Sequence, residues 1–148
     1  MILWRISNDA DLSGAGGMLH RGRRHHRGRP VVYLAESAAG ALLEVLVHVE
    51  AAQPSELPRD YQLLEVELPD DAPMEDVQLP AGDDWRRDLT LTRGLGDQWL
   101  LATRSLLLRV PSVVVGRTAN RLFNPLHPAA AACRILSAQR YPFDDRLF

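Results

Sequence analysis

The sequence contains no lysine, a single cysteine and no long apolar run, and each absence narrows what the protein can be. Cys133 cannot form a disulfide within the chain, which fits a reducing compartment. No stretch reaches roughly 18 uninterrupted apolar residues, so we expect no membrane-spanning helix. Arg5 and Asp9 fall where a secretory signal peptide would carry its apolar segment. We therefore expect a cytoplasmic protein that is neither exported nor embedded in a membrane.

Several catalytic and binding motifs are also missing. The sequence has no G-x-S-x-G elbow and no P-loop, so a serine hydrolase and an NTP-binding protein both lack support. His20, His25, His26 and His48 lie near one another in sequence, but their spacing fits no zinc pattern and the cysteine is remote. We expect no bound metal.

The absence of lysine leaves arginine as the source of all 17 basic side chains, and five of these lie between residues 20 and 29. The remainder of the chain has 12 Arg against 19 acidic residues. The Arg-rich segment can bind nucleic acid, bind a compact phosphate ligand, or simply face solvent. The acidic remainder and the lack of interleaved aromatic side chains weaken the nucleic-acid interpretation. A phosphate needs one or two guanidinium groups.

A length of 148 residues predicts one domain with its own hydrophobic core. We predict strands at residues 2–6, 31–36 and 61–68, the last with Leu64, Val66 and Leu68 facing inward. Ser37 is expected to cap a helix from Ala38 to about Glu50.

In the second half of the chain, apolar and polar residues alternate less regularly. Residues 69–84 carry six acidic residues and three prolines, which indicates a surface excursion. Asp97 is expected to cap a helix over 98–105, and residues 117–128 are expected to form a structured loop. Further strands are predicted at 106–110, 112–116 and 134–143. Strands and helices in this irregular order predict an α+β fold with a mixed or antiparallel sheet.

The predicted helix after Ser37 carries one narrow polar stripe, formed by Gly40, Glu44 and His48 at four-residue spacing. Two interpretations remain open. Glu44 and His48 can form a weak surface pair. If the stripe faces a cleft instead, the Glu44 carboxylate can stabilise positive charge that develops on a substrate.

Four other polar residues have ordinary structural explanations. Tyr33 on an inward strand face is typical of core packing with a satisfied hydroxyl. Ser112, Asn120 and Asn124 lie near prolines and are typical turn formers.

Six stretches that run through almost the whole chain match one family in the family's own order: ILWRI with DLSGAGG, GRRHHRGRPVVYLAES, ALLEVLVHVE, VPS at 110–112, NRLFNPLHP and FDDRLF. Together they resemble the RES-domain toxins of bacterial RES/Xre toxin–antitoxin pairs, named after recurring Arg, Glu and Ser. The resemblance implies a single RES domain over residues 1–148. It also implies a fold similar to ADP-ribosyltransferase toxins, with a split mixed sheet and a central cleft that binds NAD.

Carried over by position, the resemblance gives catalytic roles to Arg23, Tyr33 and Glu44. It gives NAD-binding roles to Arg23, Tyr33, Ser112 and Asn124. Arg24 departs from the pattern, because an aromatic residue usually follows the Arg of this motif.

The resemblance further implies cleavage of NAD at the nicotinamide–ribose bond, with ADP-ribose passed to water, phosphate or a protein. A cognate Xre-type helix-turn-helix antitoxin is the implied partner, a homodimer is compatible with the family, and the chain itself is not expected to bind nucleic acid. Two alternatives stay open: a non-catalytic module whose Arg-rich loop docks an acidic protein, and a toxin that acts on RNA.

Overall fold

The structure is a computed structural model that describes residues 1–48, 54–56 and 59–147. Its strands are β1 (Ile2–Ser7), β2 (Val32–Ala35), β3 (Gln62–Glu67), β4 (Met74–Asp76), β5 (Leu107–Pro111), β6 (Ala119–Phe123) and β7 (Arg134–Arg140). Its α-helices are α1 (Ala15–Leu19), α2 (Ala38–Leu46) and α3 (Leu89–Ala102). Short 3₁₀ helices are η1 (Pro54–Glu56), η2 (Asp84–Arg87), η3 (Pro128–Ala132) and η4 (Asp145–Leu147).

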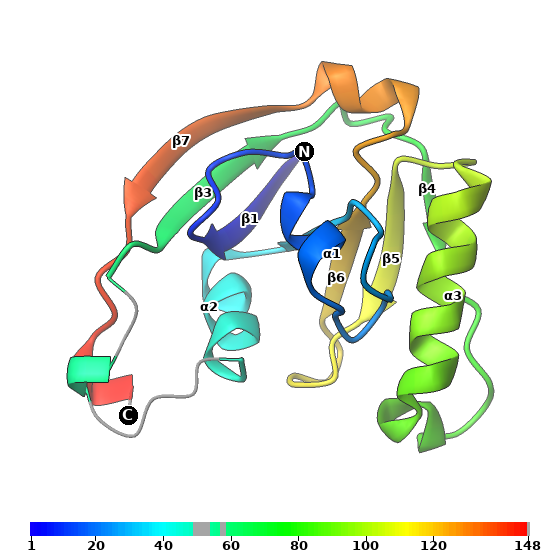
Figure 1. Cartoon of the computed structure of the whole chain (residues 1–148), viewed down its shortest axis with the longest axis horizontal. Coiled ribbons are helices and arrows are strands. Elements are labelled where there is room, and N and C mark those ends of the chain that lie inside the picture. Colours follow the sequence, from blue (N-terminus) through cyan, green and yellow to red (C-terminus); the bar gives the residue numbers. More distant parts are fainter. Residues whose placement is uncertain (49–53, 57–58, 148) are drawn as a thin grey trace.

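The strands form one seven-stranded sheet in the order β4-β5-β6-β2-β1-β3-β7. β4 and β5 are parallel, whereas the other neighbouring strands are antiparallel, so the sheet is mixed. β1 pairs with β3 from Ile2 to Ser7, but it meets β2 at one position, where Trp4 lies opposite Ala35. The sheet is therefore split into two halves joined at this point (Figure 1). The predicted α+β fold with a mixed sheet is confirmed.

Each half of the sheet is covered by its own helix. Trp99 and Leu100 of α3 are buried in a cluster with Leu108 of β5 and Leu122 of β6. The apolar face of α2 packs on the other half, where Ala41 joins a cluster that includes residues of β1. α2 thus lies next to the junction between β1 and β2, whereas α3 lies on the half of the sheet that contains β5 and β6 (Figure 1).

The first half of the chain follows its sequence pattern closely. Leu64, Val66 and Leu68 are fully buried, as the alternation predicted. The Ser37 side chain accepts a hydrogen bond from the Gly40 N–H at 3.0 Å, which confirms it as the N-cap of α2. α2 ends at Leu46, four positions before the predicted end, and residues 49 and 50 lie outside the described chain.

The predicted start of the helix expected over residues 98–105 was wrong. α3 begins at Leu89, and its cap is Asp88, whose carboxylate accepts from the Leu91 N–H at 3.0 Å. Asp97 lies inside the helix and binds His26 of the Arg-rich segment instead. Gly94 and Gly96 lower helix propensity enough to hide the first half of α3 in the sequence. Tertiary packing of Trp99 and Leu100 outweighs that loss.

Two further expectations for the second half were also wrong. Residues 112–116 do not form a strand, because the Ser112 hydroxyl accepts the N–H groups of Val114 and Val115 and closes a turn. The expected loop at 117–128 contains β6, which pairs with both β5 and β2 and buries its apolar end. The segment 69–84 has no buried residue, as expected of a surface excursion, and it also contains β4, which adds a short parallel edge strand to β5.

No helix in the described ranges is long and apolar enough to cross a lipid bilayer.

Candidate functional site

A carboxylate held by two hydrogen-bond donors lies where α2 meets β5 and β6. The Ser112 hydroxyl donates to Glu44 Oε1 at 2.7 Å, and the Asn120 Nδ2 donates to the same oxygen at 2.8 Å. Ser112 is buried, with 3% of its surface exposed, and Glu44 is half-buried. No described residue donates to Glu44 Oε2. We call Glu44, Ser112 and Asn120 the carboxylate cluster.

The fold explains why these three residues meet. Ala35 at the end of β2 lies opposite Asn120 of β6, and the chain turns into α2 directly after this point. Asn120 also lies opposite Val110 of β5, two residues before Ser112. Adjacent strand ends and the first turns of α2 are thereby placed together. The helix stripe that carries Glu44 faces the sheet junction and does not form a surface pair with His48 in the described structure.

Arg24 lies close to the carboxylate cluster and is buried, with 4% of its surface exposed. Its Nη2 donates to the Pro111 carbonyl at 2.7 Å, one residue before Ser112, and its guanidinium lies 5.4 Å from the centre of the Trp85 ring. Burial lowers the pKa of Arg24 to about 10, whereas the negative charge of Glu44 acts in the opposite direction. Arg24 therefore stays charged at neutral pH, and Trp85 supplies an aromatic ring beside the position that departs from the family motif.

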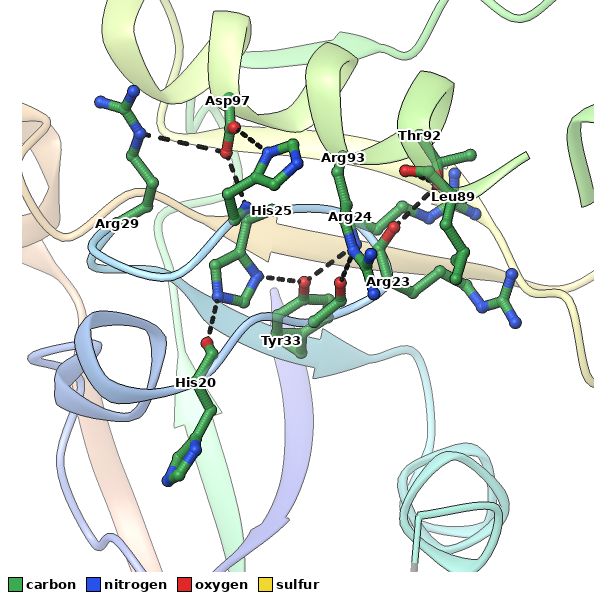
Figure 2. Close-up of polar contacts among 12 residues, drawn as sticks. His20, Arg23, Arg24, His25, Arg29, Tyr33, Leu89, Thr92, Arg93 and Asp97 are labelled. Atoms are coloured by element: carbon green, nitrogen blue, oxygen red, sulfur yellow. Dashed lines mark hydrogen bonds and ion pairs between the residues drawn. The ribbon is translucent and has the colours of Figure 1, made fainter. Parts of the chain in front are cut away.

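Tyr33 of β2 fixes the loop that carries the arginines, as Figure 2 shows. The Arg24 N–H donates to the Tyr33 hydroxyl at 3.2 Å. His25 Nε2 faces the His20 carbonyl at 2.9 Å and must carry the proton, so Nδ1 accepts from the Tyr33 hydroxyl at 2.6 Å. Burial raises the pKa of Tyr33 well above its ordinary value, which keeps that hydroxyl a donor. The hydroxyl is therefore used within the protein.

The same histidine makes stability depend on pH. Burial lowers the pKa of His25 below its ordinary value. Below about pH 6.5 His25 binds a proton in the unfolded chain but stays neutral in the folded chain. The free energy of unfolding therefore falls as the pH falls through this range. Above that range His25 is neutral in both states, so it adds nothing to the pH dependence of the free energy of unfolding. We expect urea midpoints measured between about pH 5 and pH 7 to decrease toward the acid end.

His25→Gln should flatten this slope, because glutamine does not titrate. His48→Gln removes an exposed histidine and is the control, which should keep the wild-type slope. Equal slopes in His25→Gln and the wild type would contradict a neutral His25 in the folded protein.

Arg23 lies next to this network, on the α3 side. Its Nη1 donates to the Arg86 carbonyl at 2.8 Å, and its own carbonyl accepts from the Thr92 hydroxyl at 2.8 Å. The side chain is half-buried, and the structure shows no contact between Arg23 and Glu44. The structure therefore brings Tyr33, Glu44 and Ser112 into one region together with the loop of Arg23, while the role of Arg23 stays a prediction.

Asn124 is not brought to the carboxylate cluster. It follows the far end of β6, about 13 Å along the strand from Asn120. Its amide is used by the backbone, donating to the Leu100 carbonyl at 3.3 Å and accepting from the Leu126 N–H at 3.0 Å. It lines a shallow pocket with Met18, Arg29, Leu101 and Leu126. Its NAD-binding role stays a prediction that the geometry does not favour.

Sequence reasoning missed two residues of this region. Asn120 was treated as a turn former, although a strand at 119–123 would have placed it on the same face as Leu122, which packs against α3. Trp85 gave no signal, because it lies in an acidic stretch without periodicity. Within the described residues, no three His, Cys, Asp or Glu side chains gather closely enough to hold a metal ion.

Comparisons with known proteins agree with this architecture. The profile of the RES domain matches residues 2–144. "Toxin Res" of Pseudomonas putida is 49% identical over 100% of both chains. "Prs ADP-ribosylating toxin" of Sphingobium sp. is 37% identical and covers 97% of this chain and 94% of its own.

A solved structure has the same fold. A chain of the Mycobacterium tuberculosis MbcT–MbcA toxin–antitoxin complex superposes with a TM-score of 0.69 at 17% identity, covering 95% of this chain and 83% of that chain. The family rests on the profile and on the full-length relatives, and the likeness to this structure shows the fold. The chain belongs to the RES domain family of toxins.

Proposed function

We propose that this protein is the toxin of a toxin–antitoxin pair and that it cleaves NAD at the nicotinamide–ribose bond. The observation that carries the proposal is the carboxylate cluster, in which two donors hold one Glu44 oxygen and leave the other without a partner in the described chain. The ADP-ribosylating relative supports NAD as the substrate. The relative's activity comes to this chain as part of the proposal.

The reaction breaks the bond between the ribose C1′ and the nicotinamide nitrogen. The bonding electrons leave with nicotinamide, which becomes neutral, and the ribose passes through an oxocarbenium-like state. An ionised Glu44 offsets this positive charge and accepts a hydrogen bond from a ribose hydroxyl through Oε2. The acceptor, which is water, phosphate or a protein side chain, then bonds to C1′ through a lone pair, and any proton on its attacking atom passes to solvent.

The other residues bind and orient the substrate. Arg23 holds phosphate or ribose oxygens through its guanidinium fork. The Tyr33 ring packs against nicotinamide, while its hydroxyl stays bonded to His25. Ser112 acts through Glu44, because its hydroxyl hydrogen is already donated to that carboxylate. In this proposal Ser112 is a positioning residue for Glu44.

A cytoplasmic location follows from the same proposal, since NAD and the antitoxin partner are both found there. The partner is a cognate Xre-type helix-turn-helix protein, and the match to a toxin–antitoxin complex supports an antitoxin of some kind. An acidic segment of that protein would complement the Arg-rich loop. A homodimer of the toxin remains part of the proposal.

Incubation of the purified chain with NAD tests this function. We expect nicotinamide release that follows protein concentration and disappears in Glu44→Gln, and we expect cellular NAD to fall after induced expression. A parallel sample with RNA should stay intact. RNA cleavage without nicotinamide release would indicate a toxin that acts on RNA, and neither activity would indicate a non-catalytic binding module.

A further inference from the structure

Arg93 extends from α3 toward the Tyr33 ring, on the side where the Arg23 backbone binds the same helix (Figure 2). Its Nε donates to the Gly22 carbonyl at 2.8 Å, which fixes the plane of the guanidinium. The side chain is half-buried. In the described part of the chain, its Nη1 and Nη2 atoms have no hydrogen-bond partner. Two donors of a fixed fork are therefore left for a ligand.

Three arginines lie on the two segments next to Tyr33: Arg23 and Arg24 on the loop, and Arg93 on α3. None of the ion pairs between described residues involves Arg23, Arg24 or Arg93. The neighbouring Asp97 is used by His26 and Arg29. Besides the larger effect of burial, the charge of Arg23 lowers the pKa of Arg24, so these two guanidinium groups repel one another in the unliganded protein. An anion between them would relieve this repulsion.

The three arginines are not equally available to that anion. Arg24 is buried, and its Nη2 is committed to the Pro111 carbonyl. Arg23 is half-buried and uses Nη1 alone, leaving its other donors. Arg23 and Arg93 each leave nitrogen atoms of the fork without a partner in the described chain. Their segments lie side by side, since the Thr92 hydroxyl donates to the Arg23 carbonyl. Two forks suit a ligand with two adjacent phosphates, whereas a single phosphate needs one.

We propose that Arg93 is a substrate-binding residue that, together with Arg23, selects ligands with a diphosphate over ligands with a single phosphate. This inference rests on the proposed function for the identity of the substrate. The inference gives α3 a direct part in substrate binding. Arg93 lies outside the sequence stretches that carry the family resemblance. The catalytic step stays with Glu44.

Calorimetry with ADP-ribose and AMP tests the inference without requiring turnover. In Arg93→Met we expect the affinity for ADP-ribose to fall roughly 10- to 100-fold and the affinity for AMP to fall by less than about threefold. Arg93→Lys keeps the charge but loses the fork, so its loss should lie between those of the wild type and Arg93→Met. Arg140→Met removes an exposed arginine on β7 and should match the wild type.

Several outcomes would overturn the inference. Equal losses of affinity for ADP-ribose and AMP would show that Arg93 holds the loop through Gly22 and does not bind the second phosphate. Unchanged ADP-ribose binding in Arg93→Met, or no ADP-ribose binding by the wild type, would remove the site altogether. If Arg93→Met does not fold, the Arg93→Lys result decides. A wild type that binds ADP-ribose through Arg93 but releases no nicotinamide would instead count against the proposed function alone.

Discussion

Glu44→Gln is expected to slow nicotinamide release from NAD by about 10²- to 10³-fold while leaving the fold intact. The substitution removes the negative charge that offsets the oxocarbenium-like ribose. It keeps the shape of the side chain and an Oε1 acceptor for Ser112 and Asn120, which both donate to that oxygen. The loss should therefore appear in kcat, measured at saturating NAD, with the urea midpoint close to that of the wild type.

A matched control separates the role of Glu44 from a general effect of removing a carboxylate. Glu36→Gln removes a partly exposed carboxylate that pairs with Arg121, and its turnover should stay within about twofold of the wild type. Asn120→Ala keeps the Glu44 charge but removes one charge-assisted donor, so a smaller loss of about 10- to 100-fold is expected. Turnover by Glu44→Gln at the wild-type rate would exclude Glu44 from the chemistry.

The sequence correctly predicts the elements in which the apolar residues of the pattern are also the buried residues of the structure. The strand with Leu64, Val66 and Leu68 alternates and is buried on one face, and Ser37 provides an explicit N-cap. The sequence does not reveal the first half of α3, because Gly94 and Gly96 have low helix propensity. Trp99 and Leu100 of α3 also pack against Leu122 of β6, a strand that the sequence pattern does not reveal.

The candidate site was predictable to a different degree at each residue. Glu44 and Ser112 are separated by 68 positions, and no spacing rule connects them. The family resemblance named both residues, but their mutual hydrogen bond required the three-dimensional arrangement. The sequence does not identify Asn120 as a site residue, because residues 117–128 resemble a loop. They contain β6, and this strand places Asn120 beside Glu44.

Gly96→Ala is expected to detach the arginine loop from α3 and to cost both stability and activity. A Cβ at position 96 would lie 1.6 Å from the Arg24 carbonyl oxygen, a backbone atom that cannot rotate away. Overpacking of this kind lowers the free energy of unfolding by about 1 to 3 kcal/mol. Displacement of Arg23 and Arg24 by about 1 Å would also lower nicotinamide release by about 100-fold.

Gly94→Ala makes the same chemical change one half-turn earlier in the same helix. A Cβ at position 94 meets no atom within 4 Å, so alanine should raise the free energy of unfolding by about 0.5 to 1 kcal/mol through better helix propensity and should leave turnover unchanged. The two variants are thus expected to shift the urea midpoint in opposite directions. A Gly96→Ala protein as stable and as active as Gly94→Ala would mean that the loop does not rest on α3. The placement of Arg23 and Arg24 next to Arg93 would then lose its structural basis.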